Sequence, residues 1–446
     1  MAQYRNGAEW MVRFESGLRF RRPRQEFNGQ QPEDKPMLAA APSFVPTPML
    51  PNQWDARQLI EALRVGVAPA QHIRDLTIGL EAERASLTAA LVQAHSDGGA
   101  ARAVIGEYGF GKSHIVELTA REALDRRFLV AATSLDLLEL PPHRAFDIYG
   151  SLMRNLRYPD EDERGLGPLL AQIKEVPRLR DQVRDIAKVE NDPLVVGLTA
   201  LSALSSSRQQ TAWENWLMGG RRVKLMNRAT PRGIRFPSIY RVGHNARQIA
   251  YMISGVSVLA RLAGYSGLCI LIDEAESYSL LQAYQRPKAS LFFSAVIHAA
   301  LGAERSHLSA DDLPQHRFRE YPLSYGERQS LFFLFTVTRS DNRMPLEDWL
   351  TDDQILELNP HHSPQEIGHF LEEVMTFHAQ AYGYEVDERQ RQIRRGAAEH
   401  LALGMRTDRL SIRGVVRLAV ELFDLLYLYP QYDVAVMLNE LREQMR

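Results

Sequence analysis

The sequence predicts an α/β protein in which helices flank a parallel sheet, with a long and mostly helical insertion and a C-terminal helical lid. Three observations lead to this prediction. A complete phosphate-binding pattern, G-x-x-x-x-G-K-S, occupies residues 106–113 between a short apolar run and a helical run. A second apolar run, at residues 268–272, ends in two adjacent acids. Apolar residues at helical spacing recur through much of residues 143–260 and again through 367–428.

The composition is that of an ordinary globular protein with room for two or three domains: 446 residues, 45% hydrophobic and 24% charged. The net charge of −2 points to no general class of partner. The single cysteine, Cys269, excludes an internal disulfide and a multi-cysteine metal site. No run is apolar enough to cross a bilayer, and residues 1–24 carry charges where a signal peptide has an apolar core. We therefore expect a cytoplasmic protein with no membrane contact.

The segment 106–114 contains the residue types that a phosphate site needs. Gly106, Gly109 and Gly111 are expected to take positive φ and to bring backbone N–H groups to phosphate oxygens, with the positive end of the following helix behind them. Lys112 is expected to reach the β- and γ-phosphates, and the Ser113 hydroxyl to ligate Mg²⁺. The remaining predicted contacts in this segment are Glu107, Tyr108, Phe110 and His114. A chance match is disfavoured because a strand and a helix flank the motif.

The apolar run at 268–272 predicts a buried strand, and the acids at its end suit water activation. Asp273 is expected to hold Mg²⁺ through a water, and Glu274 to orient or deprotonate the attacking water. Cys269, inside this strand, is expected to be a buried packing residue. Together with the upstream motif, these two acids predict ATP and Mg²⁺ as ligands and ATP hydrolysis as the reaction.

Two further polar positions complete the expected site. The strand predicted at 330–338 has a polar end at which Thr338 is the first candidate to sense the γ-phosphate, with Asn342 as the second. The alternative is a strand that simply ends in polar residues. Arg413 lies in the first turn of a helix capped by Ser411, where an arginine can swing onto a bound γ-phosphate. The alternative for Arg413 is an exposed surface side chain.

The domain organisation follows from composition shifts along the chain. Residues 1–54 are expected to form a basic arm and a proline-rich linker, more consistent with a solvated tail than with a contact to nucleic acid or to a neighbouring subunit. Residues 55–360 are expected to form the ATPase core, with N-terminal helices and the insertion at about 143–260. Residues 361–446 are expected to form the helical lid.

One stretch has a strongly one-sided charge. Between Glu214 and Asp273 there is no acidic residue, and the first part of this stretch is punctuated by glycine and proline like a loop or hairpin. It could present cations to DNA phosphates or to a protein partner, or it could be a solvated loop or a subunit contact. The candidate cations are Arg221, Arg222, Lys224, Arg228, Arg232 and Arg235.

The order of these elements resembles the AAA+ ATPases: five core strands, an Asp-Glu pair ending the third, a polar end on the fourth, and a helical lid containing an arginine. More narrowly, the chain resembles the P-loop ATP-binding proteins of BREX phage-exclusion gene clusters. The segments that support the resemblance are "RQLIEALRVGV", "GEYGFGKSH", "NARQIAYMISG" leading to "GLCILIDEAES", and "LSIRGVVRLAVELFD". It covers about residues 55–428, while the first 50 residues and the loop at 305–321 lie outside it.

The resemblance implies a role in defence against foreign DNA, in a homo-oligomer that works with other proteins of the defence system. It implies nucleotide contacts and acid chemistry at Gly106, Gly111, Lys112, Ser113, Asp273 and Glu274. An arginine finger is left open among Arg286, Arg305 and Arg339. The oligomer number and the partner's identity are not indicated.

Three functions compete on the sequence. The first is an oligomeric ATPase whose cycle drives or licenses a partner acting on DNA, which Glu274 favours. The second is a slowly hydrolysing, nucleotide-dependent switch or scaffold that recruits an effector. A kinase that phosphorylates a small molecule is the weakest, because Asp273 and Glu274 suit water activation. Free phosphate as the product would indicate hydrolysis, and a phosphorylated acceptor would indicate a kinase.

Overall fold

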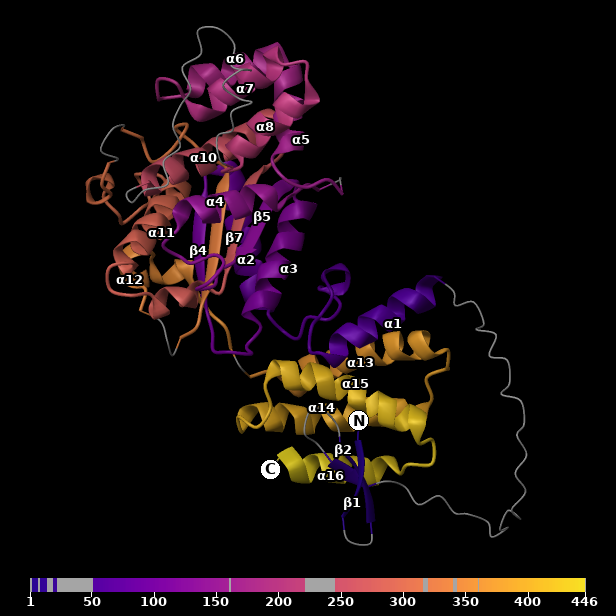
Figure 1. Cartoon of the computed structure of the whole chain (residues 1–446). Helices are drawn as coiled ribbons and strands as arrows, with labels where there is room; N and C mark the ends of the chain where they lie inside the picture. Colours follow the sequence, from indigo (N-terminus) through magenta and orange to yellow (C-terminus); the bar gives the residue numbers. More distant parts are fainter. Residues whose placement is uncertain are drawn as a thin grey trace. The chain divides into compact units, whose positions relative to one another are not determined.

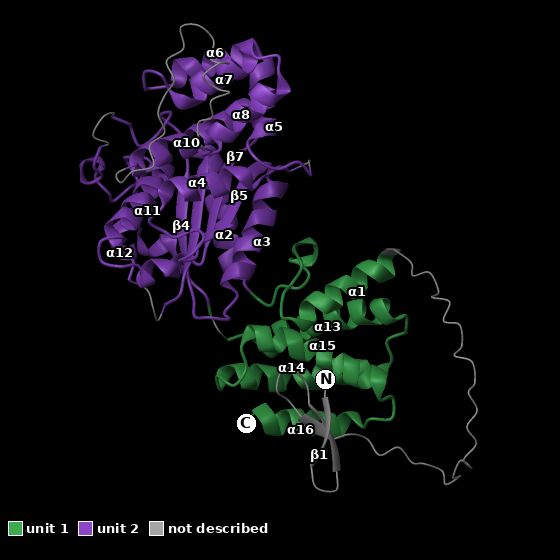
Figure 2. Cartoon of the chain, in the orientation of Figure 1, with its two compact units in different colours: residues 1–79, 359–446 green, residues 80–358 purple. Residues whose placement is uncertain are grey.

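The computed structural model describes residues 2–6, 9–13, 19–21, 51–159, 162–220, 245–315, 320–339, 343–359 and 361–445. The chain divides into two compact units, residues 1–79 with 359–446 and residues 80–358 (Figure 2). This division differs from the expected boundaries, because residues 55–79 group with the C-terminal helices instead of with the nucleotide core. Helical periodicity alone does not tell which apolar surface a helix packs against.

The unit formed by residues 80–358 contains a six-stranded sheet in the order β6-β5-β7-β8-β4-β9. Every neighbouring pair is parallel except β5 and β6, which are antiparallel. The strands are β4 (Ala100–Ile105), β5 (Phe128–Ser134), β6 (Leu156–Arg157), β7 (Gly267–Asp273), β8 (Leu331–Val337) and β9 (Ile355–Glu357). This confirms the predicted α/β fold with helices flanking a parallel sheet, except that the edge strand β6 is antiparallel.

Alternating side chains of the central strands enter two different cores, which makes this unit three-layered. In β7, Leu268, Ile270 and Ile272 face one core, while Cys269 and Leu271 face the other. The first core lies under α4 (Ala145–Arg154), α10 (Ala246–Leu262) and α11 (Arg286–Leu301) (Figure 1). The second lies under α2 (Glu81–Ser96) and α3 (Lys112–Asp125). Burial on both faces explains the unbroken apolar strand runs in the sequence.

Strand register brings the functional positions together. Ser134 at the end of β5 lies opposite Asp273 at the end of β7, and Ile105 at the end of β4 lies opposite Val337 at the end of β8. Because these four strands are parallel, their carboxyl ends meet at one edge of the sheet, where open α/β sheets bind ligands.

The insertion is helical, as predicted, in its described parts. It contains α5 (Gly167–Glu175), α6 (Pro177–Ile186), α7 (Pro193–Ala203) and α8 (Ser207–Leu217), followed after a gap by α10. Trp213 and Trp216 are buried with ring centroids 5.4 Å apart, so both belong to the core of this unit. Short elements after β7 are η2 (Ala275–Leu280), η3 (Ala310–Asp312), α12 (Leu346–Trp349) and η4 (Asp352–Gln354).

The other unit is built on α13 (Pro364–Tyr382), α14 (Glu388–Arg406), α15 (Ile412–Leu428) and α16 (Val434–Met445), with α1 (Pro51–Arg64) and η1 (Ala70–His72). Leu59, Ile60 and Leu63 of α1 are buried in the core that α13 and α15 form. Arg64 pairs with Asp424 and donates to the Tyr382 hydroxyl at 2.8 Å. In the described residues, no helix is both long and apolar enough to span a bilayer.

The start of the chain differs from the expected arm. β1 (Ala2–Asn6), β2 (Glu9–Arg13) and β3 (Arg19–Arg21) form an antiparallel sheet with Ala2 opposite Arg13. The sequence signal was Gly7, because a glycine between two short strand-like runs favours a hairpin turn. The arginine content of the segment had suggested a solvated tail instead.

Candidate nucleotide site

The predicted phosphate loop lies between β4 and α3, at the carboxyl edge of the sheet. Gly109 and Gly111 have φ of 86° and 87°, so both need the freedom of glycine to turn the backbone. The prediction of positive φ was wrong for Gly106, which is not in this region. A Cβ at Gly106 would lie 3.2 Å from the Leu358 Cβ, so close packing favours glycine there.

Lys112 is buried, with 8% of its surface exposed, at the start of α3. Its ammonium donates to the Gly106 carbonyl at 3.0 Å, to the Glu107 carbonyl at 3.3 Å and to the Thr338 hydroxyl at 3.0 Å. The charge therefore sits inside the loop, where the loop's N–H groups and the end of α3 also favour an anion. A lysine at this place can neutralise the β- and γ-phosphates of a bound nucleotide.

Thr338 follows β8 directly and is 7% exposed. Its hydroxyl accepts from Lys112 and donates to Glu276 Oε1 at 2.8 Å, and that same carboxylate oxygen lies 4.0 Å from the Lys112 ammonium. Glu276 Oε2 is buried and has no hydrogen-bond partner among the described residues. The structure thus places Thr338 between the lysine of the phosphate loop and a third carboxylate.

Asp273 is the last residue of β7, and hydrogen bonds reach one of its two carboxylate oxygens. Its Oδ1 accepts from the Thr336 hydroxyl at 2.5 Å and from the Glu274 backbone N–H at 3.0 Å. Among the described residues, no group donates to Oδ2. Ser113 is exposed in the first turn of α3. A free carboxylate oxygen and a free hydroxyl at one sheet edge are hard donors that suit Mg²⁺ with water and phosphate ligands, so these residues fit the ion.

Glu274 has a left-handed backbone, with φ of 55°, and its side chain is held by Ser134. The Ser134 hydroxyl donates to Glu274 Oε2 at 2.7 Å, from the neighbouring strand β5. The Glu274 N–H also lies 3.2 Å from the Thr336 hydroxyl. A positive φ in a residue other than glycine costs free energy and occurs often at functional sites. Glu274 is exposed, so its carboxylate can receive a proton.

The remaining predicted contacts of the loop differ in exposure. Tyr108 is 79% exposed, whereas Phe110 packs against the core under α2 and α3. His114 follows Ser113 in α3, and burial lowers its pKa to about 4, so it is neutral at neutral pH. Glu107 contributes its carbonyl to Lys112. Tyr108 is therefore the loop side chain that is most available to a ligand or partner.

Other predicted residues lie elsewhere or are not described. Arg413 lies exposed in the first turn of α15, in the other unit, with Ser411 capping that helix as expected, so its sensor role stays a prediction. Arg339 follows Thr338 and pairs with Glu357. The second sensor candidate, Asn342, and the basic stretch Arg221, Arg222, Lys224, Arg228, Arg232 and Arg235 lie outside the described residues.

Sequence reasoning missed three residues of this site: Thr336, whose hydroxyl contacts Asp273 and Glu274, and also Ser134 and Glu276. Ser134 had a signal in its position at the polar end of a predicted core strand. Glu276 had a signal in the run Asp-Glu-Ala-Glu, whose last acid lies in the turn after the strand. Neither signal predicts the contact partner, because Ser134 and Glu276 each bind a side chain at the end of a different strand.

Residues 52–192 match the family described as "BREX system ATP-binding protein BrxC/D". The resemblance that the motifs indicated is thereby confirmed in the part of the chain that contains the phosphate loop. Comparison with curated proteins finds no match.

Among solved structures, the Walker-type ATPase PABY2304 of Pyrococcus abyssi is similar to this chain with a TM-score of 0.33 and 14% sequence identity. The similarity covers 82% of this chain and 72% of that one.

Proposed function

We propose that this chain binds ATP with Mg²⁺ and hydrolyses it, as an ATPase of a BREX phage-exclusion system. The observation that carries the proposal is the meeting of Lys112, Asp273 and Glu274 at the carboxyl edge of one sheet. This set combines a cation for the phosphates, a carboxylate for the metal and a second carboxylate for water. The match of residues 52–192 to an ATP-binding family of these systems supports the same proposal.

Each residue has a role that its geometry allows. Lys112 leaves the loop carbonyls for the β- and γ-phosphate oxygens, which are stronger acceptors for its charge. Ser113 and the free oxygen of Asp273 would hold a hydrated Mg²⁺, which would neutralise charge on the phosphates. Glu274 accepts a proton from the water that attacks the γ-phosphorus. The Thr338 hydroxyl, which already contacts Lys112, donates a hydrogen bond to a γ-phosphate oxygen.

The wider role we propose is that of an oligomeric motor or licensing ATPase that acts on DNA with partner proteins of the system. The family match and the acid-free stretch that begins after Glu214 support this proposal. Charge reversal at Arg221, Arg222 and Lys224 should then weaken DNA binding and flatten its dependence on salt. DNA binding that is indifferent to these changes would contradict a DNA role for the stretch.

A slowly hydrolysing switch is the second candidate, and one observation favours it. Glu274 is held by Ser134, and Lys112 is held by the loop and by Thr338, so both groups must exchange partners before turnover. Such an arrangement suits a protein that hydrolyses ATP only when a partner releases these contacts.

Phosphate release from ATP, measured with and without DNA, tests the proposal. Lys112→Ala should lower kcat/KM by at least about 100-fold, because the phosphates lose a preorganised charged donor. Glu274→Gln should still bind ATP but release no phosphate, since an amide cannot accept the proton. The matched control is Lys174→Ala, a lysine of α5 whose ammonium donates to Gln210. Wild-type turnover that stays negligible with DNA and partners present would favour the switch, and unchanged activity in Lys112→Ala would refute the site.

A further inference from the structure

A second cavity lies in the same unit, at the end of the sheet opposite the phosphate loop. It has a volume of about 760 Å³. Gly98, just before β4, and Ser330, just before β8, both line it. The six residues of β4 at roughly 3.3 Å each separate the two ends of the sheet by about 20 Å. The cavity is therefore distinct from the nucleotide site and of a size typical for small-molecule pockets.

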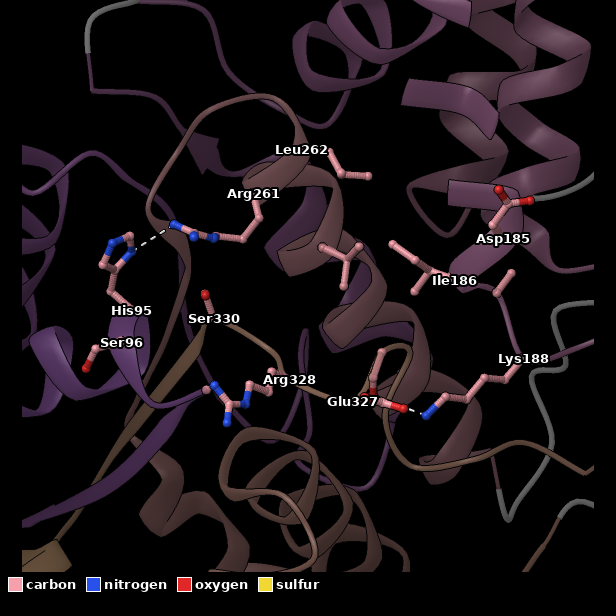
Figure 3. Close-up of a pocket in the computed structure, with 14 residues that line it drawn as sticks. His95, Ser96, Asp185, Ile186, Lys188, Arg261, Leu262, Glu327, Arg328 and Ser330 are labelled. Atoms are coloured by element: carbon pink, nitrogen blue, oxygen red, sulfur yellow. Dashed lines mark hydrogen bonds between the residues drawn. The ribbon is translucent and has the colours of Figure 1, made fainter. Parts of the chain in front are cut away.

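Cations from separate segments surround this cavity (Figure 3). Arg261 comes from the last turn of α10, Arg328 from the segment before β8, and Lys188 from the segment after α6. His95 lines it from the end of α2. Two acids, Asp185 and Glu327, are the carboxylates of the lining.

The two arginines are not neutralised by these acids. Among the described residues, neither Arg261 nor Arg328 forms an ion pair, and Asp185 lies 3.9 Å from a different arginine, Arg184. The Lys188 ammonium donates to the Gly326 carbonyl at 3.2 Å, which does not neutralise its charge. Exposed cations without carboxylate partners that face one hollow favour an anionic occupant.

The contact between Arg261 and His95 also favours a bound hydrogen-bond acceptor in this cavity. The Arg261 guanidinium lies 2.9 Å from His95 Nδ1 (Figure 3). The same ring nitrogen lies 3.0 Å from the Ser266 carbonyl. A guanidinium only donates and a carbonyl only accepts, so one ring nitrogen cannot satisfy both. Either the carbonyl of Ser266 is left without a donor or the Arg261 N–H faces another N–H. The other guanidinium N–H groups of Arg261 have no partner among the described residues, so they can donate to an anion in the cavity.

The rest of the wall is apolar. Ile186, Val258 and Leu262 line the cavity between the cations, and Figure 3 shows Ile186 and Leu262 across from Arg328. Guanidinium groups donate hydrogen bonds in a fork that matches the oxygens of a phosphate. We propose that this cavity binds a phosphorylated small molecule, with the phosphate between Arg261 and Arg328 and an apolar or ring portion against Ile186, Val258 and Leu262.

This inference does not depend on ATP hydrolysis, and its test measures binding. The full-length protein is loaded with Mg²⁺ and ADP to fill the phosphate loop, and then titrated calorimetrically with AMP and with phenyl phosphate. Adenosine and phenol serve as the probes without phosphate. We expect saturable one-to-one binding of at least one phosphate probe, and at least about tenfold weaker binding of its partner without phosphate, since a charged hydrogen bond contributes 1.4 kcal/mol or more.

Variants that remove a positive or a negative charge from the lining sharpen the test. Arg261→Gln and Arg328→Gln should each weaken binding about tenfold, whereas Glu327→Gln should strengthen it, because it removes a carboxylate from the lining. Arg121→Gln, at an arginine of α3 paired with Asp125, is the matched control and should change nothing. Binding should persist in Lys112→Ala, which separates this cavity from the nucleotide site.

Two outcomes would overturn the proposal. One is the absence of saturable binding by both phosphate probes, or binding that the arginine variants do not alter. The other is binding confined to a 5′-phosphorylated single-stranded oligonucleotide, which would assign this surface to nucleic acid instead of to a small molecule.

Discussion

The ammonium of Lys112 donates a hydrogen bond to the Thr338 hydroxyl at 3.0 Å, although 226 residues separate them in the chain. The same hydroxyl donates to Glu276, which makes Glu276 the counter-ion of the phosphate-loop lysine through one intervening group. A phosphate that enters the loop must therefore compete with Glu276 for Lys112 and for Thr338.

The first prediction concerns Glu276. Glu276→Gln keeps an acceptor for Thr338 but removes the negative charge beside Lys112, so ATP should bind about threefold more tightly, the range expected for a partly exposed ion pair. Glu276→Ala should lower kcat more than it changes KM, because the Thr338 hydroxyl loses the acceptor that orients it. Steady-state kinetics separate the two effects. Identical behaviour of the two variants would show that Glu276 does not position Thr338.

The second prediction concerns the Thr338 hydroxyl. Thr338→Val keeps the shape but removes the hydroxyl, and turnover should fall at least about tenfold through loss of one hydrogen bond to a charged phosphate oxygen. Thr338→Ser should retain most of the activity because its hydroxyl can reach the same partners. Phosphate release at saturating ATP measures both. Equal loss in the two variants would point to a packing role for this buried position.

The third prediction concerns the hydrogen bond from Ser134 to Glu274. Ser134→Ala frees the carboxylate, and basal turnover should rise by up to about tenfold, since a hydrogen bond to a charged group contributes about 1.5 kcal/mol. Ser134→Thr keeps the hydroxyl and serves as the control. Turnover without DNA or partners is the measurement. A fall in turnover would instead mean that Ser134 holds Glu274 in its working position.

The fourth prediction concerns the stability of the protein in mild acid. Burial lowers the pKa of His114 to about 4 in the folded chain, against 6.5 for an exposed histidine. The unfolded chain therefore binds a proton that the folded chain rejects, so stability falls as pH drops from 6.5 towards 4, by up to about 3 kcal/mol. His114→Asn should flatten this fall in denaturant unfolding. His369→Gln, at an exposed histidine of α13, should leave it unchanged.

The fifth prediction concerns the unit that contains α1. Burial raises the pKa of Asp424, but the hydrogen bonds from His378 and Arg64 outweigh burial and hold the pKa below its usual value. Arg64→Met should destabilise this unit by about 3 kcal/mol, because a buried carboxylate loses its cation. Chemical denaturation monitors the loss, with Arg406→Met, at an exposed position of α14, as control. Equal stability of the two variants would show that His378 alone satisfies Asp424.

Local patterns in the sequence were sufficient to predict the phosphate loop, the Asp273-Glu274 pair and the strands that precede them. Each is a short segment whose chemistry and burial depend on neighbours along the chain: glycines that allow tight turns, an unbroken apolar strand, and charges at its end. The helical insertion and the helices of residues 364–428 were predicted for the same reason, since periodicity of apolar residues is a local property.

Only the tertiary structure decided which side chains meet. Ser134 reaches Glu274 across 140 residues and Thr338 reaches Glu276 across 62, because the order and register of parallel strands bring their ends together. The packing of α1 against α13 and α15 was also decided by the tertiary structure, since it depends on which apolar surfaces bury one another. The sequence by itself determined the chemical groups of the candidate site. The partners that hold those groups depend on contacts between distant segments, which no local pattern specifies.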